Sequence, residues 1–148
     1  MLANMTQEQT DRENREHCKR IAEEIEAIAE GKFYRCPDCG ELYEIDDDTD
    51  DDAPHTCPNC GSETEYPEQA TLYDYFSDVL DIEYRIGGRG DFRSVRLMVA
   101  CGGPNIYVDT ESQAVELYWW TDRASYHLTG DACEQIDSEF EELYACTR

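Results

Sequence analysis

Lysine is almost absent from this sequence, and basic residues are scarce in general. The 148 residues contain two lysines, ten arginines and 35 acidic residues, so the formal net charge at pH 7 is −23. Most nonspecific affinity for nucleic acids comes from Lys and Arg contacts with phosphates. The composition therefore argues against a protein that itself binds DNA or RNA, and it favours a basic protein as partner.

Long apolar segments are missing as well. No run of 18 apolar residues occurs, and the first residues, MLANMTQEQTD, contain no basic segment followed by an apolar one. A membrane-spanning helix needs about 20 predominantly apolar residues, and a secretory signal needs that N-terminal pattern. We therefore expect a soluble protein of the cytoplasm that has no membrane as partner.

The common motifs of catalysis are also lacking. The sequence contains no GxSxG, no Walker A motif and no HExxH, and its glycine turns, GGRGD and CGGPN, do not have the spacing of a phosphate-binding loop. The cysteines outside the CxxC pairs described next have no recognisable histidine partner in the sequence. We therefore predict a protein without enzymatic activity.

Cysteine, in contrast, is abundant and regularly spaced. Four of the eight cysteines form two CxxC pairs separated by 17 residues, and a glycine follows each pair. This spacing is typical of structural zinc sites, and four thiolates leave no coordination position for a catalytic water. An iron site or two disulfides are the alternatives. The pattern predicts one structural Zn²⁺ per chain, bound by Cys36, Cys39, Cys57 and Cys60.

Neither the histidines nor the other cysteines show a second metal pattern. His55 lies two residues before Cys57, but four thiolates already complete a tetrahedral site, so we interpret it as a loop residue facing solvent. In the cytoplasm the remaining cysteines are expected to stay reduced, and no role is assigned to them: Cys18, Cys101, Cys133 and Cys146.

The segment between the two CxxC pairs is strongly acidic. Residues 36–69 contain 12 acidic residues and no Lys or Arg. An EF-hand calcium loop starting at Asp46 would need Gly and Glu where Asp51 and Cys57 stand. A solvated loop, adaptation to high salt, or imitation of the phosphate charge of DNA remain as interpretations. Under the last interpretation, six aspartates form the partner-binding surface: Asp46, Asp47, Asp48, Asp50, Asp51 and Asp52.

Hydrophobic periodicity predicts an α+β protein with three parts. Residues 1–31 form an N-terminal helix that begins with a capping box of Thr6 and Gln9, and only its second half has an apolar face. Residues 32–67 form a four-cysteine zinc ribbon with the acidic loop. Residues 68–148 form a short helix, an antiparallel meander of four to five strands, and a final helix opened by Asp131 and Glu134.

Two adjacent tryptophans stand out in one predicted strand. Neighbouring residues on a strand face opposite sides of the sheet. We therefore expect one of Trp119 and Trp120 to lie in the core and the other to lie under a helix or to anchor a partner.

Two resemblances accompany these patterns. Residues 33–66, through CPDCG and CPNCG, are similar to zinc ribbons. Residues 70–148, through YDYFSDVLDIEYRI, VACGGPNIYVDT, VELYWWTDRASYHL and the final helix, resemble a family of small accessory proteins carried by phages and mobile elements of Gram-positive bacteria. Small size, acidity and a structural zinc together resemble anti-CRISPR proteins. That resemblance implies an inhibitor, acting in a bacterial host cell, of an RNA-guided DNA nuclease.

Two functional hypotheses follow. In the first, the protein binds a basic nucleic-acid-handling protein, a CRISPR effector nuclease above all, and blocks the loading of DNA into a positively charged channel. An anti-restriction protein that imitates DNA is a close variant. In the second, the chain is a zinc-ribbon regulatory or adaptor module that recruits a transcription or replication protein.

Overall fold

The computed structural model describes residues 6–44, 55–64 and 68–147 and confirms the α+β class. A long helix, α1 (Gln7–Ala29), leads into small hairpins that contain the CxxC pairs. A five-stranded sheet with two further helices follows, α2 (Leu72–Tyr75) before the strands and α3 (Gly130–Cys146) after them. Within the described residues, no helix has the length and apolar character needed to cross a membrane.

The helix α1 begins and packs as its sequence predicts. The side chain of Thr6 accepts a hydrogen bond from the backbone N–H of Gln9, and the Gln9 side chain accepts one from the backbone N–H of Thr6. This capping box satisfies N–H groups that the first helical turn leaves without partners. The buried residues all lie in the second half of the helix: Cys18, Ile21, Ala22, Ile25 and Ile28.

The five strands of the large sheet form an antiparallel meander. Their spatial order is β10-β9-β8-β7-β6, so strands that are consecutive in sequence are also neighbours in the sheet. Short turns suffice for such connections. The strands are β6 (Asp81–Ile86), β7 (Phe92–Ala100), β8 (Asn105–Asp109), β9 (Ala114–Trp119) and β10 (Asp122–His127).

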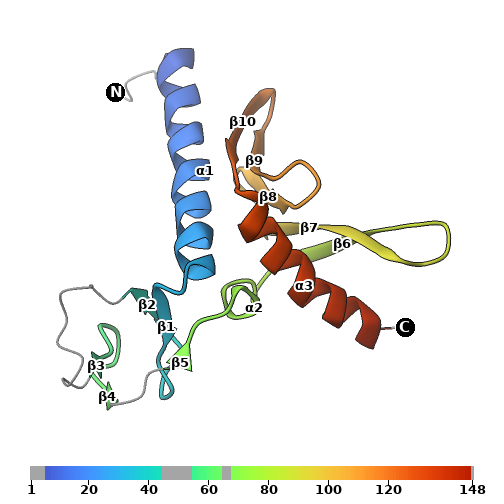
Figure 1. The fold of residues 1–148 in the computed structure, drawn as a ribbon. Coiled ribbons are helices and arrows are strands. Elements are labelled where there is room, and N and C mark those ends of the chain that lie inside the picture. Colours follow the sequence, from blue (N-terminus) through green and yellow to red (C-terminus); the bar gives the residue numbers. More distant parts are fainter. Residues whose placement is uncertain (1–5, 45–54, 65–67, 148) are drawn as a thin grey trace.

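The main core lies between one face of this sheet and the helices (Figure 1). Alternate residues of the three central strands point to this face and are fully buried: Val95, Leu97, Ile106, Val108, Val115 and Leu117. They form one cluster with the apolar residues of α1 and with Ile136 and Phe140 of α3. Each large apolar side chain buried in this way stabilises the fold by about 1.5–3 kcal/mol.

The final helix starts earlier than the sequence pattern predicts. The N-cap residue is Thr129, whose hydroxyl accepts a hydrogen bond from the backbone N–H of Ala132, and not Asp131. Thr129 is also tied to α1, because its N–H and its hydroxyl donate to the two carboxylate oxygens of Glu26 at 2.7 and 2.8 Å. The contact with Glu26 joins residues 103 positions apart, so no local sequence signal contains it.

Candidate metal centre

Two hairpins with the same backbone pattern hold the four cysteines. The first joins β1 (Phe33–Arg35) to β2 (Leu42–Glu44), and the second joins β3 (His55–Thr56) to β4 (Glu63–Thr64). In both turns, the first cysteine donates its N–H to a carbonyl five residues later, and the glycine after the second cysteine donates back to the carbonyl of the first, at 2.9–3.0 Å. The repeated CPxCG sequence therefore gives two equivalent turns.

The glycines of the two turns have a conformational role. Gly40 and Gly61 have φ angles of 80° and 74°, in the left-handed region that side chains with a Cβ disfavour. A Cβ at either position would meet no atom within 4 Å, so backbone conformation and not space selects glycine here. These turns direct both cysteines of each pair toward the opposite hairpin.

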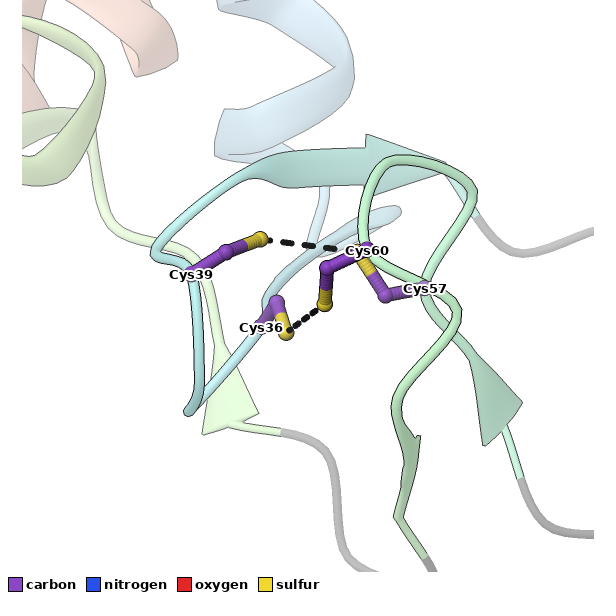
Figure 2. A group of neighbouring side chains, drawn as sticks. All are labelled: Cys36, Cys39, Cys57 and Cys60. Atoms are coloured by element: carbon purple, nitrogen blue, oxygen red, sulfur yellow. Dashed lines mark hydrogen bonds between the residues drawn. The ribbon is translucent and has the colours of Figure 1, made fainter.

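The four sulfur atoms converge on one point (Figure 2). The Sγ atoms of Cys36 and Cys60 are 3.7 Å apart, as are those of Cys39 and Cys57, and all four lie within 4.8 Å of one another. A disulfide would need about 2.05 Å. An ideal tetrahedron with metal–sulfur bonds of about 2.3 Å separates its sulfurs by about 3.8 Å. The geometry therefore fits a four-coordinate metal ion, and the cluster unites all four predicted ligands.

The electrostatics of the cluster also favour a cation. Backbone hydrogen bonding from Glu41 and the side-chain amide of Asn59 lower the pKa of the Cys39 thiol to about 7. The backbone N–H of Ser62 acts in the same direction on Cys60, but desolvation and the neighbouring cysteines raise the pKa of Cys60 to about 12. Thiolates this close repel one another. A divalent cation between the four sulfurs would remove that repulsion.

Polar contacts connect the two hairpins around the sulfurs. The side-chain amide of Asn59, in the second turn, donates to the Sγ of Cys39 in the first at 3.6 Å, and its backbone N–H donates to the Sγ of Cys57 at 3.4 Å. The hydroxyl of Ser62 donates to the carboxylate of Asp38, again from one turn to the other. These contacts orient the sulfurs but bury little apolar surface.

Apolar packing inside the ribbon is slight. Its buried residues are Cys36, Tyr43 and Cys57, with Tyr34 packed against them. The hairpin strands have two or three residues each. Isolated hairpins of this size are not stable in water. A metal ion is therefore the strongest available link between the two hairpins.

His55 is not part of the metal cluster within the described residues. The group of possible ligands consists of the four cysteines, and the imidazole of His55 is stacked on the ring of Tyr34 with centroids 6.1 Å apart. The predicted solvent-facing loop position is thus wrong in part, because His55 begins β3 and is half-buried.

The first hairpin attaches the ribbon to the main core. The strand β5 (Glu68–Gln69) pairs with β1, and the Gln69 side-chain amide donates to the carbonyl of Gly31 at 3.0 Å. Phe33 and Leu42 pack against the core cluster of the helices and the sheet. Figure 1 shows the ribbon at the C-terminal end of α1, beside α2. The cysteine cluster is therefore anchored on the α+β domain.

Other predicted site residues lie elsewhere. The six aspartates predicted to bind a partner, Asp46–Asp48 and Asp50–Asp52, lie outside the described residues. None of the eight cysteines forms a disulfide; Cys18 and Cys133 are buried, whereas Cys101 and Cys146 are exposed. The expectation that one tryptophan lies in the core is wrong: Trp119 and Trp120 are 39% and 87% exposed. The strand ends at Trp119, and Trp120 lies in the following turn.

Fold and site together define an α+β protein with four clustered cysteines that could hold a metal ion. No family model matches the chain, and no solved structure matches it. Among curated proteins, the chain is similar to transcription factor E from Pyrobaculum aerophilum, with 34% identity over 62 residues. The match covers 42% of this chain and 35% of that protein, so the chain spans about a third of the length of this relative.

Proposed function

We propose that this chain is a non-enzymatic, zinc-dependent regulatory module that recruits a protein of the transcription machinery in the cytoplasm. The observation that carries the proposal is the cluster of four cysteine sulfurs in a chain similar over 62 residues to a transcription factor. The resemblance to phage accessory proteins and anti-CRISPR inhibitors remains a prediction from the sequence.

The metal has a structural role in this proposal. Four thiolates prefer Zn²⁺ and leave it no open position, so the ion links the hairpins and takes no part in chemistry. In this respect the ribbon resembles other small metal modules, in which the free energy of metal binding is also the free energy of folding. Without zinc, the surface that the two hairpins present would be lost.

The charge around the centre favours a protein as partner over nucleic acid. Exposed carboxylates border the centre on both hairpins: Asp38, Glu41, Glu44 and Glu63. The guanidinium of Arg35 lies 3.6 Å from Glu68 and 3.8 Å from Asp74, so this cation is already paired. Phosphates would be repelled, whereas Lys and Arg side chains of a partner would be attracted.

Purified RNA polymerase and initiation factors from the cells that encode this chain provide the direct test. Zinc-loaded protein is expected to bind one of them with a Kd in the micromolar range or below, measured by biolayer interferometry. Cys57→Ser should lose this binding, and Cys101→Ser should keep it, because Cys101 is exposed and outside the cluster. Failure of the wild-type protein to bind any of these components would reject the proposal.

The net charge of −23 supports a second candidate, an inhibitor of a basic nuclease. A strongly acidic protein can occupy the positively charged channel that holds the nucleic acid. The assay is DNA cleavage by a purified RNA-guided nuclease with increasing amounts of this protein. Unchanged cleavage at a large molar excess would reject this candidate for that nuclease.

A further inference from the structure

The turn between β9 and β10 displays both tryptophans of the chain. Trp119 pairs with Asp122 at the end of the two strands, so Trp120 and Thr121 form a two-residue loop. The indole of Trp120 is 87% exposed, and its ring contact is with Trp119, at 5.8 Å between centroids. We call residues 118–123 the tryptophan hairpin. Its tip exposes a large apolar surface that the fold itself does not cover.

The backbone of Trp120 shows that the turn does not select this residue. Its φ angle is 57°, in the left-handed region. Two-residue hairpin loops require a positive φ at this position, and Gly or Asn adopts it at much lower cost than an aromatic residue. A tryptophan here strains the backbone and gains little packing in return. The side chain is therefore better explained by a contact outside the chain.

Two further residues of the tryptophan hairpin, Tyr118 and Arg123, are of types common at protein interfaces. Tyr118 and Arg123 are paired across the two strands, and the Arg123 guanidinium lies 5.8 Å from the centroid of the Tyr118 ring. Tyr, Trp and Arg are the residue types that contribute most to binding energy at protein interfaces. The aromatic rings of Tyr and Trp bring large contact areas at a low entropic cost.

Charges beside the hairpin restrict the chemistry of the partner. The side-chain amide of Gln7, at the start of α1, donates to Asp11 at 2.9 Å and to Asp122 at 2.8 Å. Two carboxylates are thus held together next to the tryptophans. An anionic membrane or a phosphate backbone would be repelled at this edge. Basic side chains at the border of an apolar pocket would complement it.

We propose that the tryptophan hairpin is the anchor by which this chain docks on a protein partner. The partner presents an apolar pocket that takes the indole of Trp120, with Lys or Arg side chains at its border facing Asp11 and Asp122. The proposal rests on the proposed function for the partner's identity, a component of the transcription machinery. It adds a second contact at the sheet, far from the cysteine hairpins that make the first contact (Figure 1).

Fluorine NMR provides a selective test, because the chain contains two tryptophans and both lie in this hairpin. Protein labelled with 5-fluorotryptophan is titrated with the purified RNA polymerase component that it binds. Both resonances are expected to shift or broaden at stoichiometric amounts. Trp120→Gly should weaken binding by about 30-fold, the loss typical of a hot-spot residue.

The glycine variant separates docking from folding. Glycine fits the positive φ of this turn, so Trp120→Gly should keep or slightly raise the melting temperature while binding falls. Leu80→Ala is the control, because Leu80 is an apolar residue outside the hairpin that is 56% exposed. This variant should bind like the wild type.

The possible failures are distinguishable. If Trp120→Gly binds the component as tightly as wild type, the hairpin proposal is wrong and the proposed function stands. If the wild type binds no transcription component, the proposed function fails and the hairpin proposal with it. Changes of the fluorine signals on raising the concentration of the protein alone, or on adding anionic vesicles, would assign the tryptophans to self-association or to a lipid surface and overturn the proposal.

Discussion

The guanidinium of Arg85 makes a two-point ion pair with the carboxylate of Asp109, with Nη1–Oδ1 and Nη2–Oδ2 distances of 2.8 and 2.7 Å. Arg85 belongs to β6 and Asp109 ends β8, so the pair spans the intervening strand β7. Asp109 is 3% exposed and also accepts a hydrogen bond from the backbone N–H of Glu111. The pair therefore connects three strands with the β8–β9 turn.

Asp109→Asn should destabilise the protein by about 2 kcal/mol at pH 7, since the half-buried guanidinium of Arg85 would keep only the exposed carboxylate of Glu111, at 3.1 Å, as counter-charge. Although burial opposes it, hydrogen bonding from Arg85 holds the pKa of Asp109 below its usual value. A lowered pKa stabilises the folded state above the unfolded pKa of about 4, and this contribution is lost as the pH falls through the folded pKa. Urea unfolding at several pH values measures both effects.

An exposed ion pair on the same sheet face provides the control. Glu83 accepts from Arg96 at 3.3 Å, and its side chain is 58% exposed. Glu83→Gln should therefore change the stability by less than about 0.5 kcal/mol. Equal losses for the two variants would show that the Arg85–Asp109 pair has no special role in joining the strands.

Substitution of Asp137 in α3 should have the opposite effect on stability. Burial is the main cause that raises its pKa, and the carboxylate of Glu141 adds to it. A raised pKa means that the charged carboxylate disfavours the folded state at pH 7. Asp137→Asn is expected to stabilise the protein by about 0.5–1 kcal/mol at pH 7. The gain should vanish below about pH 4, where the carboxyl is protonated in both states.

Glu142 is a matched control for this prediction. It lies in the same helix, is exposed and is not among the carboxylates that raise the pKa of Asp137, so Glu142→Gln removes one negative charge away from the buried group. If both variants raise the melting temperature equally, the gain comes from the net charge of the protein and not from the burial of Asp137.

Features encoded by nearby residues could be predicted from the sequence, and long-range contacts could not. The cluster of four cysteines was predictable because each CxxCG turn is local and its spacing is strict. The strands of the meander followed from alternation of apolar and polar residues, as in Val95 and Leu97. The Arg85–Asp109 pair and the Glu26–Thr129 contact have no local signal, since their partners are 24 and 103 residues apart.

Adjacent tryptophans show where a correct rule leads to a wrong expectation. The rule that neighbours face opposite sides holds inside a strand, but the strand ends at Trp119. Trp120 occupies a turn position that usually takes Gly or Asn, and the sequence TD after it is a weak turn signal. The exposed aromatic pair could be found only once the pairing of Trp119 with Asp122 was known.

The cysteine cluster leads to a prediction about metal content. Protein purified without added metal should contain one zinc ion per chain, as measured by elemental mass spectrometry. Cys57→Ser should release the ion and disorder the hairpins, because structural zinc contributes about 10 kcal/mol or more to such modules. The large sheet has its own core and should keep its amide protection. Cys146→Ser, an exposed thiol outside the cluster, should keep full zinc content. A stoichiometry near zero in reduced wild type would contradict a zinc site.

Direct binding to nucleic acid should be undetectable at physiological salt. Phosphate contacts require cations, and Arg85 and Arg96, on the sheet face opposite the main core, are already paired with carboxylates. Gel shifts with duplex and single-stranded probes are expected to show no complex at about 10 μM protein, a concentration at which nonspecific binders are often detected. A salt-sensitive complex in this range would contradict the prediction and indicate that the zinc ribbon binds nucleic acid.

The acidic loop is predicted to accelerate association with a basic partner. Replacing Asp46, Asp47, Asp48, Asp50, Asp51 and Asp52 with Asn removes six negative charges and should slow association by about tenfold or more at low salt. The effect should shrink near physiological ionic strength, where charges are screened over about 8 Å. Zinc content and melting temperature should stay nearly unchanged, because the substitutions leave the four cysteines in place.

Stopped-flow association with the purified partner measures the rate across salt concentrations. Equal rates for both proteins at every salt would show that the loop is only a solvated segment, and the loss in Trp120→Gly would then identify the surface that sets the affinity.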